Sequence, residues 1–326
     1  MAAMSSAPES GSRIYVAGHR GLVGSAIVRA LTVRGYSNLL LRRHAELELS
    51  DQSAVRTFFK QEKPEYVILA AAKVGGILAN NTYPADFIHE NLAIQTNVIH
   101  ESWRASVKRL LFLGSSCIYP RDCPQPIKED YLLTGPLEST NRPYAIAKIA
   151  GIEMCWSYNR QYGTRFVAAM PTNLYGPGDN YDLASSHVLP ALIRKVHEAK
   201  VRGEREVVVW GTGTPRREFL YSDDMADACA HLLALPDREF DTLRTDDHPP
   251  LVNIGCGEDL SIAELAAIVA QALSFKGALR FDTSKPDGTL RKLLDGGRIN
   301  ALGWRARTPL PAGIERAYAD FLRQAC

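Results

Sequence analysis

Three residues of this chain have the types and the spacing of a site that reduces a carbonyl group. Tyr144 and Lys148 form a Y-x-x-x-K pair, and Ser115 follows a short apolar run, 110–113. Residues four apart share one face of a helix, so the lysine ammonium lies one turn from the tyrosine phenol. We expect this ammonium to favour the ionised form of Tyr144, and Ser115 to hydrogen-bond the same carbonyl oxygen as the phenol. Lys148 can also reach the ribose of a nicotinamide cofactor.

A glycine-rich segment near the N-terminus could hold such a cofactor. It reads Gly18-His19-Arg20-Gly21-Leu22-Val23-Gly24. In this G-x-x-G-x-x-G pattern the glycines allow a tight strand-to-helix turn and let the helix N-terminus approach a pyrophosphate. A turn that binds nothing, and a Y-x-x-x-K pair that only packs a helix, are the alternative interpretations. The order of glycine loop, serine and Y-x-x-x-K pair favours a dinucleotide-dependent oxidoreductase.

The residues after the second apolar run indicate which dinucleotide is used. NAD-selective sites of this kind carry an acidic residue there, whereas this chain has Arg42, Arg43 and His44. Arginine can hold a 2′-phosphate through paired, charge-assisted hydrogen bonds, and Arg20 of the glycine loop could assist. The pattern therefore predicts NADP(H). The alternative is a solvated basic edge without a ligand.

Apolar runs and helical patterns predict the elements that bring these residues together. Strands are expected at 14–17, 39–41, 66–69, 110–113, 166–169 and 207–209. Helices are expected at 22–34, 51–60, 85–105, 144–158, 189–200, 224–235 and 261–273. Ser50 or Asp51 can cap the second helix, and Ser261 with Glu264 forms a capping box for the last. The alternation predicts an α/β fold, a doubly wound (Rossmann) parallel sheet with a smaller C-terminal substrate-binding lobe.

The same reading divides the chain into three parts. We expect a disordered tail over residues 1–12, an NADP-binding Rossmann domain over 13–174, and a substrate-binding lobe over 175–326 that is interleaved with the end of the sheet. Ligands of such sheets bind at the carboxyl ends of the strands. The charged loop 236–250 is given no role.

Composition excludes several classes of function. A net charge of +2 in 326 residues gives no argument for nucleic acid or an acidic membrane surface. No apolar run is long enough to cross a bilayer. The six cysteines form no C-x-x-C pair, so we expect neither a metal site nor a disulfide framework. With no signal or transit peptide pattern, the sequence predicts a cytoplasmic enzyme.

Longer strings of sequence carry a family resemblance. They are 17–21 (AGHRG), 70–77 (AAAKVGGI), 80–87 (NNTYPADF), 114–120 (GSSCIYP), 171–177 (PTNLYGP) and 285–289 (KPDGT). Over nearly its full length the chain resembles the extended short-chain dehydrogenases/reductases. It is most similar to those that act on GDP-4-keto-6-deoxy-D-mannose as 3,5-epimerase and 4-reductase. The resemblance implies formation of GDP-L-fucose with NADPH as reductant.

Epimerisation beside a carbonyl needs a base and an acid on opposite faces of the sugar ring. The resemblance implies that Cys117 is the base and His187 the acid, with the enolate oxygen held by Ser115 and Tyr144. In an extended segment, residues two apart point the same way, so Ser115 and Cys117 could both face the pocket. The alternatives are an inert buried cysteine and a histidine that only caps the next helix.

The resemblance also implies binding residues and an assembly. Expected cofactor contacts beyond those above are Ala71, Leu113, Lys148, Pro171, Asn173, Leu174 and His187. Expected contacts to the GDP-sugar are Lys195, Trp210, Arg217, Asp287 and Lys292. Whether Arg216 or Arg217 meets the diphosphate is open, and Trp210 could instead be a core residue. Relatives dimerise through the helices expected at 85–105 and 144–158, so a homodimer is expected.

Two other functions compete with this interpretation. One is another nucleotide-sugar enzyme of the same fold, a 4-epimerase or 4,6-dehydratase. A dehydratase of this type carries Thr-Asp-Glu where this chain has Ser115-Ser116-Cys117, and a 4-epimerase recycles bound NAD⁺ without net consumption of NADPH. The other is a catalytically inactive dinucleotide-sensing protein, which usually loses the tyrosine or the lysine.

Overall fold

The apolar runs of the N-terminal half form a six-stranded parallel sheet in the order β2-β1-β3-β4-β5-β9. The computed structural model describes residues 6–183, 185–285 and 287–325. The strands are β1 (Ile14–Ala17), β2 (Leu39–Leu40), β3 (Tyr66–Leu69), β4 (Arg109–Leu113), β5 (Phe166–Pro171) and β9 (Leu251–Ile254). β9 comes from the C-terminal half and pairs with β5, so the end of the chain completes the sheet.

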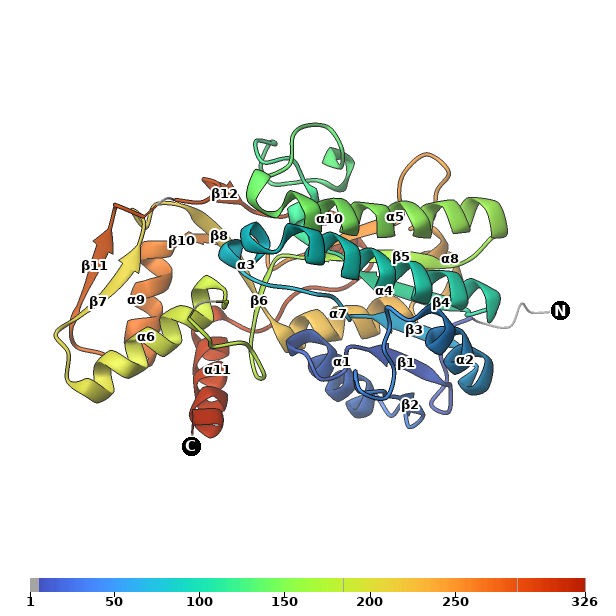
Figure 1. Cartoon of the computed structure of the whole chain (residues 1–326), viewed down its shortest axis with the longest axis horizontal. Coiled ribbons are helices and arrows are strands. Elements are labelled where there is room, and N and C mark those ends of the chain that lie inside the picture. The colour runs from blue at the N-terminus through green and yellow to red at the C-terminus, as the bar shows by residue number, and fades with distance from the viewer. Residues whose placement is uncertain (1–5, 184, 286, 326) are drawn as a thin grey trace.

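Helices cover both faces of this sheet (Figure 1). One face packs against α1 (Leu22–Val33) and α7 (Ser222–Ala234). The other packs against α2 (Gln52–Glu62), α4 (Pro84–Arg104) and α5 (Arg142–Tyr162). Side chains alternate along each strand, so the two faces bury different residues of β1 in two separate cores. The doubly wound architecture predicted from the sequence is confirmed.

Two of the predicted helix starts are confirmed in atomic detail. The Asp51 carboxylate accepts hydrogen bonds from the backbone N–H groups of Ser53, at 2.8 Å, and Ala54, at 3.0 Å. Ser261 and Glu264 form the predicted capping box at the start of α9 (Ile262–Ala272). Each cap satisfies backbone donors that the first helical turn leaves unpaired.

The C-terminal lobe is built from short strands and three helices around its own apolar core. Its strands are β6 (Asn173–Tyr175), β7 (Glu206–Trp210), β8 (Arg216–Tyr221), β10 (Asp259–Ser261), β11 (Ala278–Asp282) and β12 (Arg291–Lys292). Its helices are α6 (Val188–Arg202), α9 and α11 (Leu310–Ala325). The short elements of the chain are α3 (Ile77–Thr82), η1 (Ser116–Ile118), η2 (Glu129–Tyr131), η3 (Ser139–Asn141), α8 (Asp237–Asp241) and α10 (Gly297–Ala301).

The segment before β1 contacts the domain from Ser6 onward, so the described chain is anchored before residue 13. The Tyr66 hydroxyl donates to the Ser6 carbonyl at 2.8 Å, and the Ser6 N–H donates to the Asp237 carboxylate at 3.1 Å. Asp237 also pairs with the fully buried Arg109 at 2.6 Å. The charged loop that received no role from the sequence thus neutralises a buried guanidinium at the amino end of β4. Residues 1–5 of the expected tail lie outside the described part.

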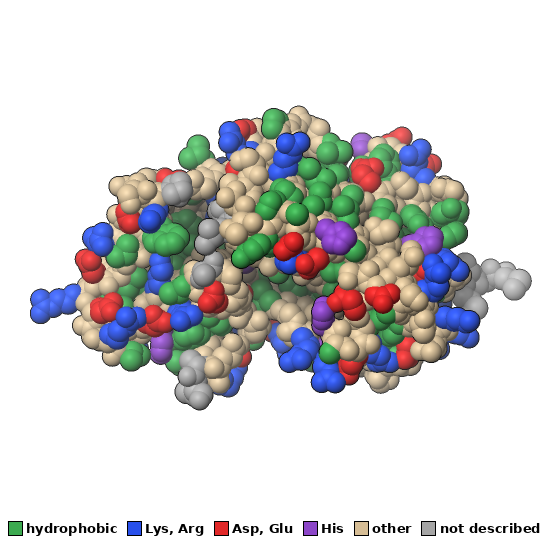
Figure 2. Space-filling view, viewed as in Figure 1, with side chains coloured by type: hydrophobic (Ala, Val, Ile, Leu, Met, Phe, Trp, Pro, Cys, Tyr) green, Lys and Arg blue, Asp and Glu red, His purple; other side chains and the backbone are tan. Residues whose placement is uncertain are grey.

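The carboxyl ends of the strands point toward the C-terminal lobe (Figure 1). The viewed face is hollowed between the lobe with α6 and α11 and the part with β1 and α1 (Figure 2). The segments 18–21, 70–76 and 114–117, which follow β1, β3 and β4, therefore lie between the two parts. No described helix is long and apolar enough to span a membrane. Within the same described ranges, no three His, Cys, Asp or Glu side chains are grouped to hold a metal ion.

Candidate active site

The glycine loop leaves no room for side chains at two of its positions. Gly18 has φ +82°, and a Cβ there would lie 2.7 Å from the backbone nitrogen of Ala71. A Cβ on Gly24 would lie 2.1 Å from the Gly18 carbonyl oxygen. The N-cap of α1 is Gly21, which has no side chain to satisfy the free N–H groups of the first turn. This cradle of backbone donors fits the pyrophosphate of a dinucleotide.

The three basic residues after β2 each have a carboxylate partner. Arg42 pairs with Glu62 and donates to the Leu41 carbonyl at 2.9 Å. Arg43 pairs with Glu46 at 2.7 Å, and His44 with Glu48 at 2.6 Å. These pairs bear on the predicted 2′-phosphate contact, because an incoming phosphate must share or replace a carboxylate.

The Nδ1 atom of His19 adds a polar group to the cradle. It is buried and has no protein partner among the described residues. Burial, and then the guanidinium of the exposed Arg20, lower the pKa of His19. A neutral imidazole with an unpaired nitrogen beside the glycine loop fits a ligand that offers hydrogen-bonding groups, as a dinucleotide does.

Lys148 is fixed in the interior behind Tyr144. Only 3% of its surface is exposed, and its Nζ donates to the Leu113 carbonyl at 2.8 Å. The ammonium lies 4.7 Å from the centroid of the Phe112 ring and 5.8 Å from that of Tyr144. Burial lowers the pKa of Lys148 to about 7. The Y-x-x-x-K spacing thus places amine and phenol together on α5, as predicted.

The expected ionisation of Tyr144 is wrong in this structure. Burial, and then the neighbouring Cys117 thiol, raise the pKa of the phenol, and only a hydrogen bond with Ser115 opposes them. Lys148 does not bring the pKa of Tyr144 back down, because burial also disfavours the positively charged form of Lys148. The ring packs edge-on against Phe87, with centroids 6.3 Å apart. Tyr144 is therefore held as a neutral phenol, which suits a proton donor.

Ser115 and Cys117 come together through a turn and not through an extended strand. The Ser115 hydroxyl oxygen caps η1 and accepts from the Cys117 N–H at 3.3 Å. The argument from residues two apart in an extended segment is therefore wrong, because the backbone turns immediately after Ser115. The Cys117 thiol still interacts electrostatically with the Tyr144 phenol.

His187 occupies the N-cap position of α6 without capping it. Its side chain makes no cap hydrogen bond. The residue is open to solvent, yet the protein around it lowers the pKa of the imidazole through desolvation. Both properties are typical of a residue that lines a cleft. The preceding loop is tied across the site by a hydrogen bond from the Gly76 N–H to the Ser185 carbonyl, at 3.2 Å.

The two arginines that begin β8 have different surroundings. Arg216 is bound by two carboxylates, Asp259 at 2.9 Å and Glu264 at 3.4 Å. Arg217 has no carboxylate partner among the described residues, and its guanidinium donates to the Arg216 carbonyl at 2.8 Å. Desolvation lowers the pKa of Arg217, while an interaction with Cys117 raises it. Arg217 is thus the arginine available for an anion, and it interacts electrostatically with the Cys117 thiol.

An exposed aromatic ring lies beyond Arg217. Trp210 is 63% exposed, so it is not a core residue. The Lys195 ammonium lies 5.0 Å and the Lys285 ammonium 5.5 Å from its ring centroid. Lys292 of β12 pairs in register with Arg217. A flat ring and four cations suit a nucleoside diphosphate.

Comparisons with known proteins agree with this geometry. The model of the NAD dependent epimerase/dehydratase family matches residues 14–255. GDP-L-fucose synthase 1 of Arabidopsis thaliana is 56% identical over 323 residues, 99% of this chain and 97% of the relative.

The chain belongs to the NAD dependent epimerase/dehydratase family. GDP-L-fucose synthase of Escherichia coli K12 is 54% identical over 96% of this chain and 97% of its own. Among solved structures, the GDP-D-glycero-L-gluco-heptose synthase of Campylobacter jejuni, in the presence of NADPH, is 40% identical. It superposes with a TM-score of 0.89, covering 97% of this chain and 99% of the other.

In this epimerase/dehydratase-family chain, some predicted contacts already have protein partners. The Asp287 carboxylate accepts from the Thr212 N–H at 3.0 Å and from its hydroxyl at 2.7 Å. The Asn173 side chain donates to the Glu218 carbonyl at 2.9 Å, which ties β6 to β8. Leu174 packs against the sheet core. The cofactor and substrate roles of these residues, and of Pro171 at the end of β5, stay predictions.

One neighbour of the site was missed by the sequence reasoning. Asn141 contacts the Cys117 sulfur. An asparagine before a proline-containing helix start reads from sequence as a helix cap, and its partner 24 residues away gives no local signal. Lys285, which lies over the Trp210 ring, belongs to the segment 285–292 that the resemblance implies for substrate contacts.

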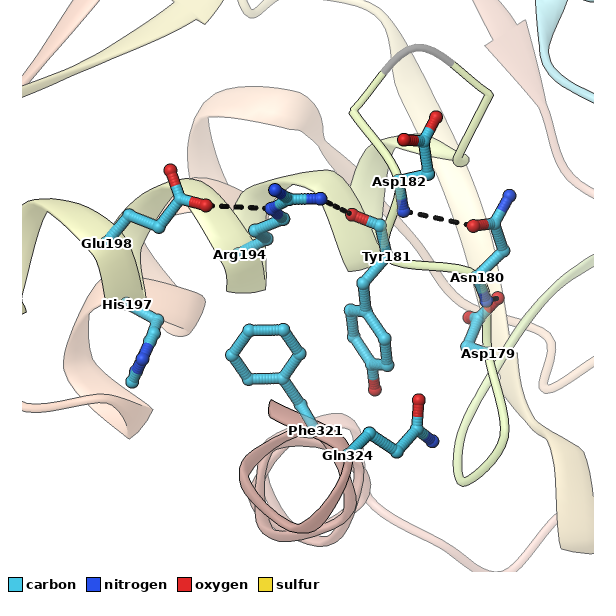
Figure 3. A pocket seen from close by; sticks show the side chains of 9 residues that line it. All are labelled: Asp179, Asn180, Tyr181, Asp182, Arg194, His197, Glu198, Phe321 and Gln324. Carbon is cyan, nitrogen blue, oxygen red and sulfur yellow. Dashed lines mark hydrogen bonds and ion pairs between the residues drawn. The ribbon is translucent and has the colours of Figure 1, made fainter. Parts of the chain in front are cut away.

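A separate pocket of about 500 Å³ lies between α6, α11 and the loop 179–182 (Figure 3). Arg194 closes one side, since it pairs with Glu198 at 2.8 Å and donates to the Tyr181 carbonyl at 3.1 Å. None of the residues predicted for catalysis or binding lines this pocket. It therefore does not enter the function that follows.

Proposed function

We propose that this chain converts GDP-4-keto-6-deoxy-D-mannose to GDP-L-fucose, by epimerisation at C3 and C5 and reduction of the C4 ketone with NADPH. The observation that carries the proposal is the grouping of Ser115, Cys117 and Tyr144, together with Arg217, which interacts electrostatically with the thiol and has no carboxylate partner among the described residues. A reductase alone has no use for a thiol next to its proton donor. The names of the relatives from Arabidopsis and Escherichia coli support the same reaction.

The cofactor would lie between the glycine loop and Lys148. When bound, NADPH supplies the hydride. The N–H groups of the first turn of α1 would bind the pyrophosphate, and Arg42 and Arg43 would bind the 2′-phosphate. Lys148, held by the Leu113 carbonyl, would orient the nicotinamide ribose.

Epimerisation uses the acidity of hydrogens next to the C4 ketone. The Cys117 thiolate removes the proton from the ring carbon, and the electrons move onto the C4 oxygen as an enolate. Ser115 and Tyr144 donate hydrogen bonds to that oxygen. Because desolvation lowers the pKa of His187, the imidazole first takes a proton from solvent and then delivers it to the opposite face of the ring. The Cys117 thiol and His187 afterwards exchange protons with solvent.

Reduction needs one more proton, which Tyr144 supplies. The C4 carbon accepts the hydride while the phenol donates its proton to the C4 oxygen. Because burial raises the pKa of Tyr144, the phenol is protonated at the start of this step. The hydrogen bond from Ser115 stabilises the phenolate left behind.

The lobe would hold the nucleotide part of the substrate. Arg217 and Lys292 neutralise the diphosphate, and Trp210 offers its exposed face to guanine, flanked by Lys195 and Lys285.

We also propose a homodimer formed through α4 and α5. Hydrophobic side chains gather over these helices on the face shown in Figure 2. The exposed hydrophobic residues of α5 include Ile146 and Tyr162. Light scattering of the wild-type protein and of Ile146→Glu tests the dimer, because a charge at a buried interface opposes association. We place the activity in the cytoplasm, which fractionation of cells tests.

The proposed function is tested by separating epimerisation from reduction. Cys117→Ser should stop deuterium exchange at C3 and C5 while NADPH binding is unchanged, since serine keeps the shape but is a far weaker base. His187→Asn should impair the same exchange. Cys123→Ser is the matched control, because this cysteine lies in the same loop and should not matter. Undiminished exchange in Cys117→Ser would contradict the mechanism, and turnover without net NADPH consumption would indicate a 4-epimerase.

A further inference from the structure

Asn141 stands where a helix cap is expected, but its side chain does not cap the helix. α5 begins at Arg142, and Asn141 makes no side-chain cap hydrogen bond. Pro143, at the second helical position, has no N–H and so removes one of the donors that a capping asparagine normally binds. The amide of Asn141 is therefore available to another partner.

That partner is the thiol of Cys117. The Asn141 Nδ2 donates to the Cys117 Sγ over 3.1 Å. The two residues are 24 positions apart, and the contact joins η3 to η1 across the start of α5. A side chain that reads as a cap in the sequence thus contacts the group that the proposed function assigns as the base.

The other end of the same amide is unpaired. The Asn141 Oδ1 is buried and has no protein partner among the described residues, and the same holds for Asn80 Oδ1 and Ser186 Oγ. A buried, unpaired acceptor costs free energy, which an apolar side chain would avoid. The cost of this acceptor and the hydrogen bond to sulfur together point to a role of Asn141 at the thiol and not in packing.

Other groups also act on the thiol. The Tyr144 phenol of α5 and the Arg217 guanidinium of β8 both interact electrostatically with the thiol. In the proposed function Arg217 binds the diphosphate, which draws its positive charge away from the sulfur. Asn141 then donates an N–H to the sulfur without also binding the substrate phosphates.

We propose that Asn141 is the positioning residue of Cys117, whose amide N–H stabilises the thiolate and aims Sγ at the sugar. The inference rests on the proposed function for the role of the thiol, but not for the contact. The thiol first loses its proton to solvent. The thiolate then takes the proton from C3 or C5 as the enolate forms, and the amide remains hydrogen-bonded to sulfur throughout.

The test measures how readily Cys117 ionises, without any substrate. The rate of alkylation by iodoacetamide is followed against pH, with the Cys117 peptide quantified by mass spectrometry and Cys117→Ser as background. In Asn141→Ala, alkylation at neutral pH should be about tenfold slower than in the wild type, because the thiolate loses a hydrogen-bond donor. Asn141→Asp should slow alkylation at least as much, because it adds a negative charge near the thiolate while keeping a residue able to cap α5.

Ser139→Ala is the matched control, since Ser139 lies in the same turn and is exposed. It should leave the alkylation profile unchanged. Asn141→Ala should also slow deuterium exchange at C3 and C5 about tenfold at neutral pH while NADPH affinity is unchanged. An alkylation profile unaltered in both Asn141 variants would overturn this inference alone. Absence of exchange in the wild-type enzyme would overturn the proposed function, whatever the alkylation profile.

Discussion

The two sides of the cleft hold their positive charges in different ways. After β2, Arg42 and Arg43 each bind a carboxylate. In the lobe, Arg217 and Lys195 have no such partner among the described residues, and desolvation lowers the pKa of both. A cation that loses water without gaining a counter-charge costs free energy, so it marks a place prepared for an anion. The structure therefore points more strongly to the diphosphate site than to the 2′-phosphate site.

Tyr144 lies where the two sides meet, and its loss should have the largest effect. Tyr144→Phe removes the proton donor but keeps the ring packed on Phe87. We expect kcat for NADPH oxidation to fall by about 10²–10⁴-fold, with little change in KM for either ligand. Tyr162→Phe, an exposed tyrosine of the same helix, is the control. A kcat within a factor of a few of wild type would remove Tyr144 from the chemistry.

The lobe side of the comparison is tested by the adjacent arginines. Arg217→Ala should lower kcat/KM for the GDP-sugar about 30-fold, because a charge-assisted contact to phosphate is lost. Arg216→Ala should have a much smaller effect on kcat/KM, since that guanidinium is occupied by Asp259 and Glu264. Equal losses of kcat/KM in the two variants would contradict the different roles given to Arg216, which is held by carboxylates, and Arg217, which is not.

On the cofactor side, the effect should be smaller. The Arg43–Glu46 pair is largely exposed, so Arg43 can exchange its carboxylate for a phosphate at little cost. Arg43→Ala should raise KM for NADPH about tenfold and leave KM for NADH unchanged. Glu46→Gln should not raise KM for NADPH. A wild-type preference for NADH would show that these basic residues only form ion pairs within the protein and do not bind a 2′-phosphate.

The last prediction concerns the free energy of unfolding, whose pH dependence should reflect the buried amine of Lys148. Burial lowers the pKa of Lys148 from 10.5 to about 7, so unfolding takes up a proton at any pH between these values. Unfolding is then favoured as the pH falls across that window, and stability rises with pH within it. Relative to Lys148→Met, the wild type should gain up to about 1.4 kcal/mol per pH unit between pH 7 and 9. Parallel urea denaturation curves for both proteins at all pH values would contradict this ionisation.

The same two regions differ in how far sequence predicts structure. Strands such as Ile14–Ala17 and Tyr66–Leu69 are buried on both faces, so each is a continuous apolar run that the sequence displays. In the lobe, β8 reads Arg-Arg-Glu-Phe-Leu-Tyr and β12 is only two residues long. Their pairing depends on partners far along the chain, which local patterns do not reveal.

The site shows the same division. The Y-x-x-x-K pair and the glycine cradle are local, so their geometry follows from helical and turn spacing. The raised pKa of Tyr144 and the contact between Asn141 and Cys117 depend on burial and on segments joined only by the fold. Sequence therefore predicted which residues gather, and the structure was needed for their protonation and their partners.

The central claim is that one pocket both epimerises and reduces the same sugar. Incubation of the purified protein with GDP-4-keto-6-deoxy-D-mannose and NADPH in D₂O, with the product examined by NMR, tests it most directly. The account predicts GDP-L-fucose that carries deuterium at C3 and C5, with one NADPH oxidised for each sugar formed. Oxidation of NADPH that yields a 4-hydroxy sugar without deuterium at those carbons would contradict it.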